Sequence, residues 1–178
     1  MNIQKHAILW TILCLALFTS SASATIITYN VVLSGTESVG PNVTPASGTA
    51  TVTVNDTLDT VSVNMTFTGL IGGNASAAHI HCCVATNANG PVVIPFTGFP
   101  TATSGTYSNT FTGVSAANIA GIEAGLAYIN IHNTTYPGGE IRGDILPANA
   151  VPEPTSAGLL TLAIAGLSFF GLRSRKQA

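Results

Sequence analysis

The chain is predicted to form one all-β domain, an antiparallel sandwich or Greek-key barrel of about eight strands with one short helix. Two observations support this fold class. Threonine and valine alternate along segments 49–54 and 61–67, and period-two alternation of β-branched residues is typical of half-buried strands. Clusters of Gly, Pro and Asn, such as Gly72-Gly73-Asn74, separate these segments at short intervals. Such clusters predict the turns of an antiparallel fold.

The other elements follow from the same patterns. Alternating or apolar segments bounded by turn residues are expected to be strands. One segment is expected to be a helix, because Ser115 is placed to cap it and Gly125 to end it. In chain order the expected strands are 26–33, 49–54, 61–67, 77–84, 105–112, 126–132 and 140–146, and the expected helix is 115–124.

Residues 1–24 are predicted to be a secretory signal peptide. Lys5 supplies a basic start, residues 7–18 form an apolar stretch, and Ala22-Ser23-Ala24 offers the small residues of a cleavage site. We therefore expect the secretion machinery to export the chain and signal peptidase to cleave after Ala24. The β domain is then expected to occupy residues 25–146.

The C-terminal part has three successive segments. Residues 147–154 are expected to be a linker that contains Pro152, Glu153 and Pro154, and residues 155–172 form an uncharged hydrophobic stretch. A helix over this stretch would be about 27 Å long, barely enough to span a bilayer as a transmembrane helix. The basic tail, residues 173–178, would stay on the cytoplasmic side, which places the β domain outside.

This succession of motif, hydrophobic stretch and basic tail resembles the PEP-CTERM sorting signal of Gram-negative bacteria. The resemblance implies that an exosortase-type membrane protease recognises Pro152, Glu153 and Pro154 in an inner-membrane intermediate and removes the tail. The product would then reach the cell surface or the extracellular polysaccharide of a biofilm matrix. A plain C-terminal anchor is the alternative.

The charge of residues 25–150 excludes one class of partner. This part has a single arginine, Arg142, against six acidic residues, and its net charge is therefore near −5. A domain without a basic patch has no electrostatic footprint for nucleic acid. Because Glu140 lies two residues before Arg142, we expect a structural ion pair or a shared sheet face for these two side chains.

Three histidines are candidates for a metal site. On the expected strand 77–84, alternation places His79 and His81 on one face, and on strand 126–132 it places His132 on the polar face. If the two strands are neighbours, three imidazoles can converge, and such sites suit copper or zinc. The alternative is that these histidines are ordinary polar residues on a solvated sheet face.

Cys82 and Cys83 are the only cysteines beyond the signal peptide. Export places them in an oxidising compartment. A disulfide between these adjacent residues is one possibility, although alternation would send their side chains to opposite faces. Free thiols, an intermolecular disulfide, and Cys83 as a metal ligand beside His79 and His81 are the others.

Four blocks of the β domain resemble, in order and spacing, the CHRD domain first described in chordin. They are 78–81 (Ala-His-Ile-His), 90–93 (Gly-Pro-Val-Val), 128–132 (Tyr-Ile-Asn-Ile-His) and 139–145 (Gly-Glu-Ile-Arg-Gly-Asp-Ile). The resemblance implies an extracellular β-sandwich or barrel. Cys82-Cys83 departs from the common pattern of the family.

These observations favour an exported, surface-sorted and non-enzymatic β module of the cell envelope or biofilm matrix, with extracellular polysaccharide as a possible partner. The alternative function is a copper- or zinc-binding domain that is redox-active. His79-Ile80-His81 resembles the copper-binding strand of copper/zinc superoxide dismutases. The other zinc ligands and the anion-guiding arginine of those enzymes have no counterparts that can be placed residue by residue.

Overall fold

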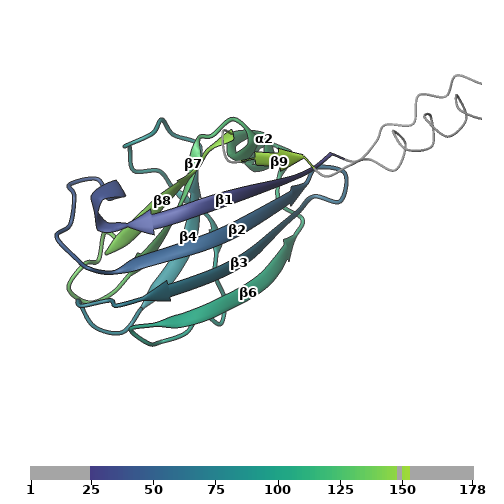
Figure 1. Cartoon of the computed structure of the whole chain (residues 1–178). Helices are drawn as coiled ribbons and strands as arrows, with labels where there is room; N and C mark the ends of the chain where they lie inside the picture. The colour runs from purple at the N-terminus through teal and green to yellow at the C-terminus, as the bar shows by residue number, and fades with distance from the viewer. Residues whose placement is uncertain (1–24, 148–149, 153–178) are drawn as a thin grey trace, which may run out of the picture.

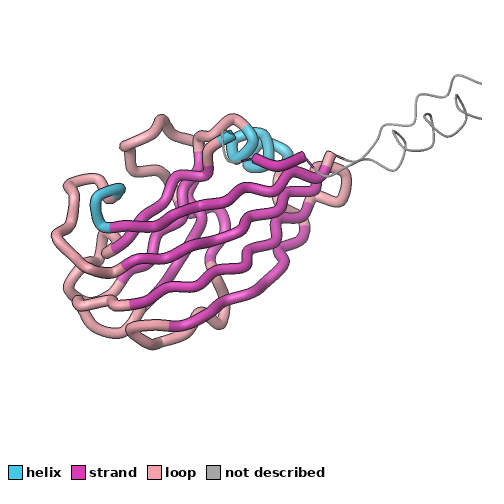
Figure 2. Tube along the Cα trace, in the orientation of Figure 1, coloured by secondary structure: helices cyan, strands magenta, loops and turns pink. Residues whose placement is uncertain are grey.

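The computed structural model describes residues 25–147 and 150–152. This part of the chain contains nine strands, one α-helix, α2 (Ala116–Glu123), and one turn of 3-10 helix, η1 (Gly35–Glu37) (Figures 1 and 2). The strands are β1 (Ile26–Ser34), β2 (Ser47–Asn55), β3 (Thr60–Thr68), β4 (Ala77–Cys82), β5 (Val92–Pro95), β6 (Gly105–Thr112), β7 (Ala127–His132), β8 (Ile141–Ile145) and β9 (Ala150–Pro152).

Eight of these strands form one continuous antiparallel sheet in the order β5-β4-β7-β8-β1-β2-β3-β6. The sheet curls until β4, β7 and β8 lie behind β1, β2 and β3, so that it is almost closed into a barrel (Figure 1). The expected all-β antiparallel fold is thus confirmed.

An aromatic cluster lies between the two edge strands, β5 and β6. Phe96 directly follows β5, and its ring centroid lies 5.1 Å from that of Tyr107 and 5.7 Å from that of Phe111, both on β6. Phe99 stacks on Phe67 of β3 at 5.2 Å. Stacked rings at such distances contribute beyond the apolar area that they bury. Side-chain packing therefore connects the two edge strands, β5 and β6, which are not joined by backbone pairing.

The core follows from the predicted alternation. Val52 and Val54 of β2 and Val61 and Val63 of β3 are fully buried, while the residues between them are more exposed. In a strand successive side chains point to opposite faces. The inward valines, together with isoleucines of β4, β7 and β8, fill the space between the two walls of the barrel.

The helix also matches its expected boundaries. The Ser115 side chain accepts a hydrogen bond from the backbone N–H of Asn118 at 3.3 Å, and Gly125 has a φ of 73° just beyond the C-terminal end. A serine cap and a left-handed glycine are the common start and stop of a helix.

Strand β5 was not expected, because it is only four residues long and ends on Pro95. Strand β4 ends at Cys82 rather than at residue 84.

Within the expected linker, Ala150–Pro152 forms β9 and pairs with the first half of β1, with Pro152 opposite Ile27. The signal peptide, Glu153, Pro154, the hydrophobic segment 155–172 and the basic tail 173–178 lie outside the described residues. In the part that is described, no helix has the length and apolar character needed to cross a membrane.

Candidate functional site

The histidines of β4 and β7 are brought together by the pairing of these two strands. His79 lies opposite Asn130, His81 opposite Tyr128, and Ala77 opposite His132. Between the histidines, Ile80 points the other way and is fully buried in the core. Because alternation fixes both strand faces at once, the three imidazoles share the outer face of the sheet.

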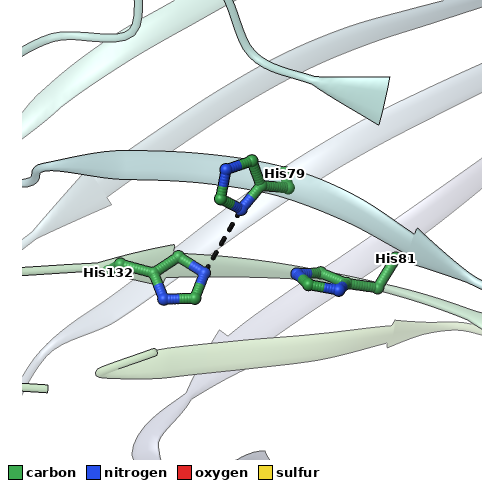
Figure 3. A group of neighbouring side chains, drawn as sticks. All are labelled: His79, His81 and His132. Atoms are coloured by element: carbon green, nitrogen blue, oxygen red, sulfur yellow. Dashed lines mark hydrogen bonds between the residues drawn. The ribbon is translucent and has the colours of Figure 1, made fainter. Parts of the chain in front are cut away.

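The three imidazoles converge at the boundary between β4 and β7 (Figure 3). Each ring offers one nitrogen, and these nitrogens all lie within 4.8 Å of one another. The closest pair is His79 Nδ1 and His132 Nε2, at 3.3 Å. His81 is buried, whereas His79 and His132 are half-buried. The sequence predicted that the three imidazoles would converge if the two strands were neighbours. The strands are neighbours and the imidazoles do converge, while metal binding itself stays a prediction.

Backbone carbonyls orient two of the three rings. His132 Nδ1 lies 2.8 Å from the carbonyl oxygen of Pro137, and His81 Nδ1 lies 2.8 Å from that of Gly90. A carbonyl oxygen only accepts hydrogen bonds, so each Nδ1 must carry the proton and donate it. In the neutral form of each ring, Nε2 then carries a lone pair, and that of His132 accepts a hydrogen bond from His79 Nδ1–H at 3.3 Å.

The surroundings of the site favour neutral imidazoles. Burial lowers the pKa of His79, and the nearby rings of His132 and His81 lower it further. Burial also lowers the pKa of His132; the hydrogen bond to Pro137 opposes this effect, and the nearby His81 adds to it. The neutral imidazole is the form that ligates metals.

Tyr128 and Arg142 build the inner side of the site. The Tyr128 ring stacks on His81 with its centroid 4.7 Å away and only 2° between the planes. The Arg142 guanidinium carbon lies 3.5 Å from the centre of the same ring. Both side chains are almost fully buried. His81 therefore belongs to a packed stack, and the outer face of β7 is not a simple solvated surface.

Of the two alternatives expected for Arg142 and Glu140, the ion pair is not formed. Arg142 Nη2 lies 2.9 Å from Asp144 Oδ1, and Arg142 Nη1 donates to the carbonyl of Ala88 at 3.0 Å. Arg142 and Asp144 are two residues apart on β8 and share one face. Glu140 precedes this strand, and its carboxylate takes hydrogen bonds from other residues. Arg142 is buried and engaged, so it is not positioned to guide anions from solvent.

The sulfur atoms of Cys82 and Cys83 are 2.04 Å apart and bonded. Cys82 is buried in the core and Cys83 is exposed. Both sulfurs pack against Gly121 of α2, because a Cβ at that position would overlap both of them. The group of potential metal ligands found among the described residues contains the three histidines and neither cysteine.

Comparison with known protein families gives two matches. The CHRD domain matches residues 29–145, and the PEP-CTERM protein-sorting motif matches residues 150–176. No curated protein and no solved structure matches the chain. The sorting motif indicates a secreted bacterial protein that is sorted to the cell surface and processed by exosortase-type machinery. Since the first match covers 117 of the 178 residues, this chain belongs to the CHRD domain family.

Proposed function

We propose that this protein is a non-enzymatic contact module, displayed on the envelope or in the extracellular polysaccharide matrix of a Gram-negative bacterium. It would arrive there through an inner-membrane intermediate. The observation that carries the proposal is a broad uncharged surface, which we call the hydroxyl face, on the outside of four neighbouring strands. Its residues are Thr28 and Asn30 of β1, Thr49, Thr51 and Thr53 of β2, Ser62, Asn64 and Thr66 of β3, and Thr106, Ser108 and Thr110 of β6.

The register of the strands arranges the hydroxyl face as a regular array. Residues two apart in a strand are about 7 Å from each other, and neighbouring strands are about 5 Å apart. Side chains in adjacent strands are close enough to hydrogen-bond: Thr49 with Thr66 at 3.1 Å, and Ser62 with Thr110 at 2.8 Å. These cross-strand bonds hold the hydroxyl groups in fixed positions.

The chemistry of the hydroxyl face suits neutral sugars. Each hydroxyl is one donor and two acceptors, so a group already paired with its neighbour still has capacity for a ligand. A shallow depression of about 590 Å³ lies over this face and is lined by polar residues such as Asn30, Thr51 and Ser108, and also by the exposed Val32. Hydroxyl and amide groups at these positions can hydrogen-bond the hydroxyls of a polysaccharide chain.

The charged residues Glu140, Arg142 and Asp144 also have structural roles, which favours a contact function for the protein and not a catalytic one. Arg142 and Asp144 pair with each other beneath the loop that carries Ala88. Glu140 is fully buried and accepts hydrogen bonds from the segment around Ile71 and Gly72. These groups hold loops onto the barrel. The hydroxyl face has no part in these interactions.

The proposal is tested by co-sedimentation of the exported protein with extracellular polysaccharide isolated from the producing cells. Thr49→Val, Thr51→Val and Thr66→Val together remove three hydroxyls while keeping β-branched side chains of similar shape. We expect the triple variant to lose at least about tenfold in affinity, roughly 1.4 kcal/mol. Thr86→Val with Thr101→Val, two exposed loop threonines, is the matched control and should bind normally. Equal binding by the triple variant and the control would refute the role of the hydroxyl face.

A further inference from the structure

We propose that His79, His81 and His132 bind one divalent transition metal ion, with zinc(II) and copper(II) as the best-suited ions, and that Asn130 supplies an oxygen beside them. This inference goes beyond the contact role proposed above, because it concerns β4 and β7 and not the strands of the hydroxyl face. It rests on three features of the geometry: the spacing of the nitrogens, the orientation of the rings, and a further polar group beside the imidazoles.

The spacing already approaches that of a metal complex. Bonds of about 2.0 Å from a tetrahedral zinc ion to two imidazoles place the two nitrogens about 3.3 Å apart. His79 Nδ1 and His132 Nε2 are separated by 3.3 Å. The nitrogens of the whole group lie within 4.8 Å, so closing the site requires a shift of His81 by only about 1.5 Å. A side-chain adjustment of that size needs no change in the pairing of β4 with β7.

The orientation of the rings is the one found around bound metals. A metal-ligating histidine usually donates its other N–H to a carbonyl or carboxylate, which fixes the ring and its tautomer. His132 donates Nδ1–H to Pro137, and His81 donates Nδ1–H to Gly90. In both rings the remaining nitrogen, Nε2, is the one that faces the other histidines (Figure 3). A histidine that only fills an exposed position on a sheet does not require Nδ1–H to be fixed by a carbonyl and Nε2 to face other imidazoles.

Asn130 places a further polar group beside the three imidazoles. Its amide nitrogen lies 3.4 Å from the carbonyl oxygen of Gly138, and its Oδ1 lies 3.1 Å from His81 Nε2. With Nδ1 already protonated toward Gly90, a neutral His81 presents a lone pair to that oxygen. Two acceptors then face each other in a buried place, which is unfavourable. A metal ion held by both atoms resolves this contact, and so does the reverse orientation of the Asn130 amide, which would donate an N–H to Nε2.

The test uses the exported protein as the cells produce it, stripped with chelator and titrated calorimetrically with zinc(II) and, separately, with copper(II). We expect one ion per chain. Each of His79→Ala, His81→Ala and His132→Ala should lower the affinity by at least about 100-fold, since loss of a mere supporting residue can already cost that much. Electron paramagnetic resonance of the copper(II) form should show coupling to three imidazole nitrogens in the native protein and to two in each variant.

Circular dichroism of the three variants checks that the barrel is retained; none of the three side chains belongs to the hydrophobic core, although His81 is buried against Tyr128. Cys82→Ser with Cys83→Ser is the matched control and should bind with native affinity, since both sulfurs pack on Gly121. Loss of binding in this control would mean that thiols hold the ion and would overturn the proposal. The absence of stoichiometric binding, or native affinity in any one histidine variant, would overturn it as well. The reverse orientation of the Asn130 amide would then explain the contact with His81.

Discussion

Glu140 is a fully buried carboxylate that joins three separate segments of the chain. Its Oε1 accepts hydrogen bonds from the Thr44 hydroxyl at 2.5 Å and from the Ile71 N–H at 3.0 Å, and its Oε2 accepts from the Gly72 N–H at 3.1 Å and from the Asn133 amide. Burial raises the pKa of Glu140, but these four hydrogen bonds lower it, and the net shift is downward. The ionised form is therefore stabilised by the fold.

Glu140→Gln should destabilise the protein by about 3 kcal/mol, because the new amide N–H₂ faces donors that need an acceptor. Since the folded pKa of Glu140 lies below its ordinary value, the stability that it contributes is present above about pH 4.5 and is lost as the pH falls through the folded pKa. Urea unfolding at pH 7 and at pH 3 measures both effects, and the difference between wild type and variant should shrink at pH 3.

Glu37→Gln is the control for this experiment, because Glu37 is an exposed glutamate. Its unfolding free energy should stay within about 0.5 kcal/mol of wild type, as for most surface substitutions. If both variants behave alike at pH 7, Glu140 does not hold the loops together as described.

At the level of single residues, alternation correctly assigned the faces of the histidines, but it could not assign the partner of Arg142. Glu140 and Asp144 are both two residues from Arg142 in the sequence, so spacing alone does not distinguish them. The difference arises because Asp144 lies on β8 with Arg142, whereas Glu140 precedes the strand, where Thr44 and Asn133 reach it. Those partners are far away in the sequence and have no local pattern.

Among the elements, α2 and the end of β4 depend on each other. Gly121 lies in the middle of α2, where glycine is ordinarily about 1 kcal/mol worse than alanine. Here a Cβ would overlap the sulfurs of both Cys82 and Cys83. The glycine is therefore required by the close approach of the disulfide to the helix, and it has no need of an unusual backbone conformation.

Gly121→Ala should lower the unfolding free energy by about 1–3 kcal/mol, the usual cost of overpacking a well-filled site. In the background of Cys82→Ala with Cys83→Ala, the same change should be neutral or stabilising, because the overlap is gone and helix propensity remains. Thermal unfolding of the four proteins of this cycle measures the coupling. Intact mass, with the disulfide form lighter than the reduced form by two hydrogen atoms, establishes the cysteine state beforehand. The same effect in both backgrounds would show that the sulfurs do not crowd the helix.

The elements that sequence patterns predicted best are the long alternating strands and the capped helix. Strand β5 has four residues and strand β9 three, too few for a periodic pattern to be recognised. The adjacency of β4 and β7 could not be predicted from the sequence either. About fifty residues separate the two strands, and the order of strands in a sheet depends on long-range contacts. The loops that bring Gly90 and Pro137 over the histidines have no periodicity at all.

At the scale of the whole molecule, the sorting motif begins directly on the folded body. Strand β9 pairs with β1, and Pro152 stands opposite Ile27, at the start of β1. The PEP-CTERM match starts at residue 150, five residues after the CHRD match ends. The first three residues of the matched motif, Ala150–Pro152, are therefore part of the folded sheet.

We predict that the mature protein lacks residues 1–24 and everything after about residue 154. Pro152→Ala, Glu153→Ala and Pro154→Ala together should leave an unprocessed chain in the inner membrane, because the protease would lose its recognition motif while the hydrophobic segment remains. Intact-mass spectrometry of surface and membrane fractions from the producing cells tests both predictions.

Pro147→Ala is the matched control, since it changes an exposed proline just upstream and leaves the motif whole, and it should be processed normally. A surface form of the wild-type protein that still carries Phe169 and Phe170 would mean that the C-terminal segment is a permanent anchor.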